Sequence, residues 1–134
     1  MNAKIIAVIT TVLGVSFTAL AADEAKLPPA STKKDVTFAA DIKPIFEKSC
    51  IKCHSGEKPK AKLRLDTVEG ALKGSKEGKV IEVGKSADSV LVKSAAHVGD
   101  SDGWMPPAKA KAKFPTLTPE QVGLVRAWID QGAK

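Results

Sequence analysis

Five consecutive residues, Cys50-Ile51-Lys52-Cys53-His54, combine two thiols and an imidazole at a spacing that suits one chemical task. Thiols two residues apart can each add to a vinyl group of the same porphyrin, which forms two thioether bonds. The adjacent His54 then lies under the iron as an axial ligand. The chain contains no further cysteine. The motif therefore predicts one covalently attached haem c, held by Cys50, Cys53 and His54.

Two other kinds of site also use a C-x-x-C pair. A thioredoxin-like redox pair normally sits on a βαβ unit, and the sequence pattern gives no sign of one. A zinc site would need two more ligands, and the only other His or Cys is His97. Haem attachment is the interpretation that these residues favour.

The second axial ligand of such an iron has two candidates. Apart from the initiator, the only methionine is Met105, in Trp104-Met105-Pro106-Pro107. Its thioether is a soft ligand that raises the reduction potential, and the prolines restrict the loop that carries it. The competing ligand is His97, which is otherwise expected to be a surface residue. An open or labile position is the third possibility, and the sequence favours Met105.

The N-terminus has the pattern of a secretory signal peptide. Lys4 precedes an apolar stretch over residues 5–20, and Ala19-Leu20-Ala21 offers a cleavage site. The expected organisation is a signal peptide over 1–21, a flexible linker over 22–36 and a monohaem cytochrome c domain over 37–134. The expected location is the periplasm, with no stable membrane span in the mature chain. An uncleaved leader would instead anchor the protein to the membrane.

Composition narrows the class of partner. The 134 residues carry 21 Lys and Arg against 15 Asp and Glu, a net charge of +6, and there is no tyrosine. Nucleic-acid binding usually gathers arginine and aromatic residues on one face, and this chain has lysine in place of both. The sequence therefore predicts no nucleic-acid partner. Lysines such as those in the run 108–113 predict redox partner proteins with acidic docking surfaces.

Helical patterns separate the motifs, which predicts an all-α fold of a few short helices around one haem. The first helix is expected from a cap at Asp41 into the cysteine motif. A short one, capped by Asp66, should end at Gly74, and another should run over 86–96 after a brief extended piece at 80–83. The last has an N-cap at Thr118, a capping box with Gln121, and a stop at Gly132.

These motifs together resemble the small cytochrome c domains known as planctomycete-type cytochrome C, within the class I-like c-type cytochromes. The resemblance rests on pieces that occur in order along nearly the whole mature chain: Phe38…Asp41-Ile42-Lys43-Pro44-Ile45-Phe46, Cys50 to His54, Leu63-Arg64-Leu65-Asp66, Gly84-Lys85-Ser86, Met105-Pro106-Pro107 and Trp128-Ile129-Asp130-Gln131-Gly132-Ala133. It implies a mainly helical fold around one haem, with His54 and Met105 as axial ligands.

The expected function is transfer of single electrons between redox partners, without enzymatic activity of its own. One alternative is a haem-based sensor or gas-binding module in which Met105 dissociates. Another is the cytochrome subunit of an exported dehydrogenase. Two further residues have predicted contacts with the haem site: the Arg64 guanidinium with a haem propionate, and the Pro59 carbonyl with His54.

Overall fold

Four short α-helices form the framework of the molecule. The structure, a computed structural model, describes Glu24 and residues 26–134, so the predicted signal peptide lies outside the described residues. The helices are α2 (Lys43–Ser49), α3 (Val68–Lys73), α4 (Val90–Ala95) and α5 (Pro119–Asp130). Within the described part there is no strand, only an isolated bridge between Ser75 and Gly78. The prediction of an all-α fold is confirmed.

Helix α5 begins and ends where the sequence predicts. The Thr118 side chain accepts from the Gln121 backbone N–H at 3.2 Å, and the Gln121 side chain accepts from the Thr118 N–H at 2.9 Å. This reciprocal pair satisfies two N–H groups that the first turn of a helix leaves free. The helix buries one apolar face, formed by Val122, Val125, Trp128 and Ile129.

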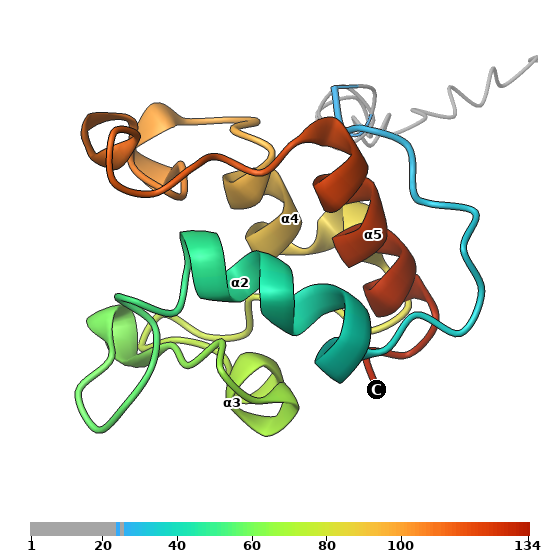
Figure 1. Cartoon of the computed structure of the whole chain (residues 1–134), viewed down its shortest axis with the longest axis horizontal. Coiled ribbons are helices and arrows are strands. Elements are labelled where there is room, and N and C mark those ends of the chain that lie inside the picture. The colour runs from blue at the N-terminus through green and yellow to red at the C-terminus, as the bar shows by residue number, and fades with distance from the viewer. Residues whose placement is uncertain (1–23, 25) are drawn as a thin grey trace, which may run out of the picture.

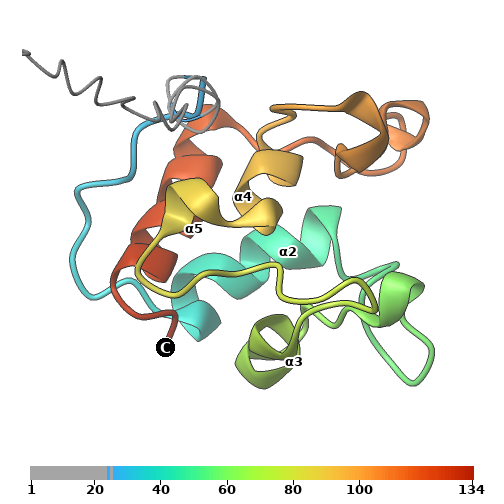
Figure 2. The same cartoon turned by 180° about the vertical axis from the view of Figure 1, so that it is seen from behind.

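An aromatic cluster joins α5 to the start of α2. The Trp128 ring is fully buried and lies 5.6 Å, between centroids, from the Phe38 ring, which meets the Phe46 ring edge-on at 6.2 Å. The Trp128 indole N–H donates to the Lys134 carbonyl at 2.9 Å. Figures 1 and 2 show α2, α4 and α5 packed together at this core, with α3 at the edge of the molecule.

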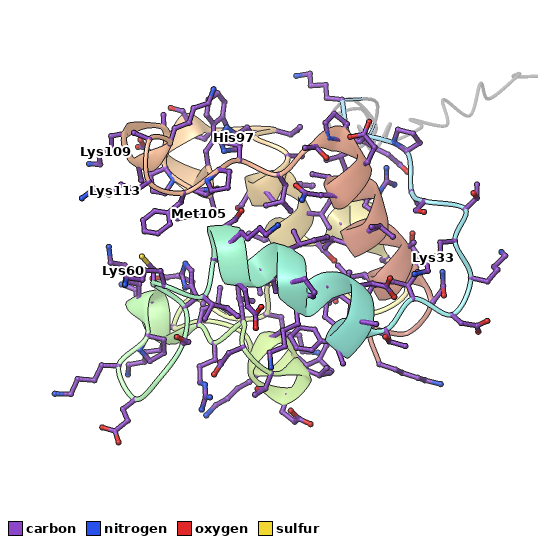
Figure 3. The ribbon with its side chains drawn as sticks, in the orientation of Figure 1. Lys33, Lys60, His97, Met105, Lys109 and Lys113 are labelled. Atoms are coloured by element: carbon purple, nitrogen blue, oxygen red, sulfur yellow. The ribbon has the colours of Figure 1, made fainter. Side chains whose placement is uncertain are left out.

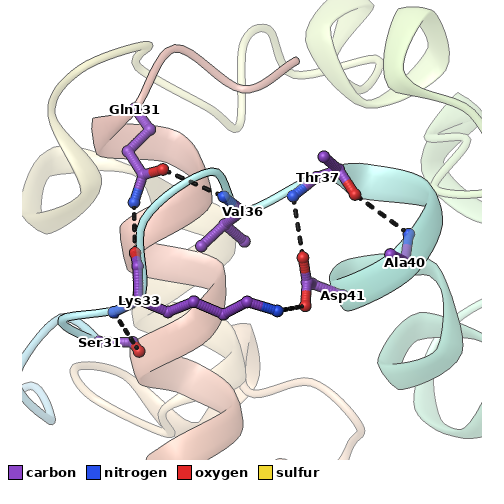
Figure 4. A network of polar contacts seen from close by, with 7 residues as sticks. All are labelled: Ser31, Lys33, Val36, Thr37, Ala40, Asp41 and Gln131. Atoms are coloured by element: carbon purple, nitrogen blue, oxygen red, sulfur yellow. Dashed lines mark hydrogen bonds and ion pairs between the residues drawn. The ribbon is translucent and has the colours of Figure 1, made fainter.

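The first helix starts earlier than predicted, so the assignment of Asp41 as its N-cap was wrong. A π-helical turn, η1 (Phe38–Ile42), precedes α2, and Thr37 caps it by accepting from the Ala40 N–H at 3.3 Å. Asp41 instead accepts from the Thr37 N–H at 3.0 Å and pairs with Lys33 (Figure 4). The hydrogen bond from Lys33 lowers the pKa of Asp41.

Two other boundaries also differ from the predictions, in each case because a side chain hydrogen-bonds to the nearby backbone. Thr67, not Asp66, caps α3 by accepting from the Gly70 N–H at 3.1 Å, although α3 stops at Gly74 as expected. The helix predicted over 86–96 is divided into a 3-10 turn, η3 (Ser86–Asp88), and α4. The buried Ser89 side chain between them donates to the Lys85 carbonyl at 3.1 Å.

The segment before η1 lies along α5. Leu27 and Val36 are buried, and the Arg126 guanidinium donates to the Pro28 carbonyl at 2.6 Å. Gln131 joins the same segment by donating to the Lys33 carbonyl at 2.8 Å and accepting from the Val36 N–H at 3.1 Å (Figure 4). The region predicted as a flexible linker over 22–36 thus includes a stretch, residues 27–36, that makes specific contacts with the last helix.

Gly123 is where this stretch comes closest to α5. The Ser31 N–H donates to the Gly123 carbonyl at 2.9 Å, and a Cβ at position 123 would lie 2.7 Å from the Pro29 carbonyl oxygen. Gly123→Ala should therefore push residues 29–31 off the helix and lower the free energy of unfolding by about 1–3 kcal/mol, the usual cost of overpacking. Denaturant unfolding of the purified protein measures this.

The matched control is Gly103→Ala, because a Cβ there would meet nothing within 4 Å. The stability of that variant should stay within about 0.5 kcal/mol of the parent. Equal stabilities of the two variants would contradict the close packing of residues 29–31 on α5.

Within Glu24 and residues 26–134, no helix has the length and apolar character needed to cross a membrane.

Candidate functional site

The cysteine motif directly follows α2, and two tight turns give it its shape. The N–H groups of Cys50 and Ile51 both donate to the Phe46 carbonyl, at 2.7 and 2.9 Å, which ends the helix. The N–H groups of Cys53 and His54 then donate to the Cys50 carbonyl, each at 3.1 Å. The chain thus folds back on itself within five residues.

A pocket of about 330 Å³ opens beside this turn. Cys50, Cys53, His54 and Met105 all line it. The rest of its wall is largely apolar and comes from α2, the loop after the motif, α4 and the loop before α5; it includes Phe46, Leu63, Leu65, Leu91, Pro106 and Phe114. Figure 1 shows the two loops on the same side of the molecule, at the left of the view.

Of the two candidate axial ligands, the structure brings only Met105 into this pocket. The Met105 N–H donates to the Ser94 carbonyl at 3.0 Å, which fixes the loop to the end of α4. His97 does not line the pocket; it is half-buried, and its ring stacks on Trp104 at 4.8 Å with an interplanar angle of 13°. Figure 3 shows Met105 and His97 on opposite sides of this loop. The expectation that His97 is a surface residue holds only in part, because the indole of Trp104 covers one face of its ring.

Burial sets the protonation of the motif. It raises the pKa of the Cys50 thiol to about 12, with a smaller contribution from Cys53. Burial also lowers the pKa of His54, against the opposite effect of the nearby backbone of Leu63 and Lys60. At neutral pH Cys50 is therefore a protonated thiol, unlike the thiolate of a redox-active C-x-x-C pair. The neutral imidazole of His54 keeps a lone pair for a metal.

His54 has an unused polar atom. Its Nδ1 is buried, and within the described residues it has no hydrogen-bond partner. The predicted partner, the Pro59 carbonyl, accepts instead from the Lys62 N–H at 3.0 Å, so that prediction was wrong. The loop from Pro59 stays attached to the motif through its backbone, because the Leu65 N–H donates to the His54 carbonyl at 2.8 Å.

Arg64 is not brought together with the other predicted site residues. Its guanidinium donates to the Asp66 carboxylate through Nε at 3.0 Å and Nη2 at 2.6 Å. It lines a second cavity and not the pocket that contains Cys50. A contact between Arg64 and a haem propionate would compete with this bidentate pair, and it stays a prediction.

Among the side chains of the pocket wall that sequence reasoning did not place there are Lys60 and Phe114. Neither belongs to a periodic helical pattern, so only their positions in the loops place them at the pocket. A zinc site is not supported. Within Glu24 and residues 26–134, no three His, Cys, Asp or Glu side chains come together in a group that could hold a metal ion.

Residues 50–109 match the family model described as Planctomycete cytochrome C. The match begins at Cys50 and includes Met105, and it confirms the resemblance predicted from the sequence over these residues. The pieces of the resemblance before residue 50 and after residue 109 lie outside the match. A cytochrome C family domain indicates haem-based electron transfer. No curated protein and no solved structure gives a significant match to the chain.

Proposed function

We propose, on the premise that residues 50–109 carry a Planctomycete cytochrome C segment, that this protein is an exported monohaem electron carrier. Cys50 and Cys53 would hold one haem c through thioether bonds, and His54 and Met105 would be its axial ligands. One observation carries the proposal: these four side chains line the same largely apolar pocket, although Met105 lies far from the others in the sequence.

The residues present suit such a group. A bound haem supplies a one-electron couple between Fe(III) and Fe(II). Cys50 is half-buried and protonated, as a thiol that adds to a vinyl group can be, and His54 offers a neutral ring. The apolar wall, including Leu63, Leu91 and Phe114, limits water at the metal and so favours the less charged ferrous state.

Lysines at the pocket support encounters with acidic redox partners. Lys60 lines the pocket, and Figure 3 shows it on the same side of the molecule as Lys109 and Lys113, which are exposed. Positive charge around an electron-transfer site speeds the approach of a negatively charged partner, and the rate falls as salt rises. Export remains a prediction from the N-terminal sequence, as does a role as the cytochrome subunit of a dehydrogenase.

A second function is favoured by one observation. Met105 is 39 % exposed, so its side chain is not locked in place by packing. A labile Met105 would leave an axial position for a diatomic gas, as in a haem-based sensor. This alternative differs from the carrier only in how firmly the Met105 sulfur is held.

Haem staining after denaturing electrophoresis, together with absorption spectra of the native protein, tests the proposal. We expect stain at the mass of the polypeptide, because thioether bonds survive denaturation. We also expect the long-wavelength ferric band that marks Met–iron ligation, and no rapid change on adding CO to the ferrous protein. A polypeptide without stain would refute covalent attachment. Stain with rapid CO binding would favour the sensor over the carrier.

A further inference from the structure

A second cavity, of about 540 Å³, lies beside the pocket lined by Cys50, Cys53, His54 and Met105 and carries an excess of positive charge. We call the first the haem pocket and the second the outer cavity. Its lining includes the cationic side chains of Lys58, Lys62, Arg64 and Lys73 and a single acidic one, Glu57. A concave site lined by one sign of charge concentrates counter-ions more strongly than the same charges on a flat surface. This arrangement points to an anionic ligand.

Most of this charge is not neutralised by the protein. Arg64 is paired with Asp66 in a bidentate contact. In contrast, no ion pair within Glu24 and residues 26–134 involves Lys58, Lys62 or Lys73. Three ammonium groups therefore remain to bind an anion, and Glu57 offsets one of them at most.

One loop separates this outer cavity from the haem pocket. Lys60, Ala61 and Leu63 line the haem pocket, whereas Lys62 and Arg64 line the outer cavity. From Ala61 to Arg64, successive residues of the loop thus line the two sites in turn.

The backbone of the loop is strained at the point where it divides the cavities. Ala61 and Lys62 have φ values of 54° and 56°, in the left-handed region that residues with a Cβ rarely adopt. A hydrogen bond from the Lys76 N–H to the Ala61 carbonyl, at 2.7 Å, helps to hold this conformation. Such strain persists only where the surrounding structure imposes it, and it is concentrated at functional sites.

We propose that the outer cavity binds a compact oxyanion with several negative charges, of the pyrophosphate class, and that its binding lowers the reduction potential of the neighbouring haem. The volume is within the range of small-molecule sites, about 300–1,000 Å³, and leaves room for more than one phosphate group. The coupling rests on the proposed function, whereas the binding does not.

The direction of the coupling follows from charge. The oxidised protein carries one more positive charge than the reduced protein, so an anion across the loop from His54 binds the oxidised form more tightly. Because coupling between two sites is reciprocal, the bound anion then favours oxidation by the same free energy. The reduction potential should fall as the cavity fills.

Calorimetric titration of the purified protein with pyrophosphate, at ionic strength held constant with NaCl, tests the binding. We expect saturable binding with a stoichiometry of one. Lys62→Gln and Lys73→Gln should each weaken it about tenfold or more, since a hydrogen bond to a charged group contributes about 1.5–3 kcal/mol. The control is Lys85→Gln, which makes the same charge change at an exposed residue outside the cavity lining and should alter the affinity less than twofold.

Absence of saturable binding would overturn the site, and so would equal weakening by all three substitutions, because that result indicates attraction to net charge alone.

A redox titration with and without pyrophosphate tests the coupling. The potential should fall in the parent and stay constant in the Lys62→Gln/Lys73→Gln double variant. Binding without a shift would overturn the coupling alone. If the proposed function fails, the polypeptide shows no haem stain. Calorimetry on that haem-free protein still tests whether the outer cavity binds pyrophosphate.

Discussion

Replacing both Cys50 and Cys53 by alanine should give a protein that carries no covalent haem and is strongly destabilised. The two thiols line the pocket and are the only cysteines in the chain, so nothing else can form the thioether bonds. Without a haem the exposed part of the apolar wall, which includes Val90 and Phe114, faces water. A cavity in a core costs about 24 cal/mol per Å³. For about 330 Å³ the upper limit is about 8 kcal/mol, comparable with the whole stability of a small domain, about 5–15 kcal/mol.

The measurements are haem stain on a denaturing gel and the thermal unfolding transition. Ser49→Ala is a suitable control, because Ser49 lines the same pocket and cannot form a thioether. That variant should keep the full stain and unfold at nearly the parental temperature. Each single cysteine variant should keep at most one thioether bond. Full stain in the double variant would show that the haem is attached elsewhere or not through these thiols.

The parts of the fold that the sequence predicted well are those encoded by local chemistry. At α5 the cap and the stop signal are contiguous with the helix, so Thr118 and Gln121 mark its start without reference to the rest of the chain. The same holds for Cys50, Cys53 and His54, whose spacing defines their chemistry. The placement of Met105 was predicted because it is the only methionine outside the initiator. Its presence in the pocket agrees with that prediction, whereas ligation itself is untested.

The differences arise where a residue has two available partners and the tertiary structure selects one. Asp41 suits an N-cap, but Thr37 takes that position and Asp41 pairs with Lys33. Arg64 suits a propionate, but Asp66 is two residues away and accepts both of its hydrogen bonds. Residues 27–36 have a linker composition, and their contacts with α5 depend on the distant Gly123 and on residues that lie nearly a hundred positions away. No local pattern records such contacts.

Met105→Ala should lower the reduction potential, abolish the ferric band of Met–iron ligation and allow rapid CO binding to the ferrous protein. A thioether stabilises Fe(II), so its loss favours the ferric state. A fall on the order of 0.1 V is expected, within the range of about 0.8 V that axial ligands span. The fold should survive, because the side chain is 39 % exposed and the loop is held by the Met105 backbone N–H at the Ser94 carbonyl. Redox titration and absorption spectra measure these changes.

His97→Asn separates ligation from a general effect on the loop. Asparagine tolerates the left-handed backbone at this position, where φ is 55°, but removes the stacking on Trp104. If Met105 is the ligand, His97→Asn should keep the ferric band, and any loosening of the loop should lower the potential in the same direction as Met105→Ala. If His97 is the ligand, its loss should raise the potential, since a histidine in that position stabilises Fe(III) relative to a thioether, and Met105→Ala should leave the spectrum unchanged. The two hypotheses thus predict different results for one variant: a rise in the potential identifies His97 as the axial ligand, and an unchanged or lower potential identifies Met105.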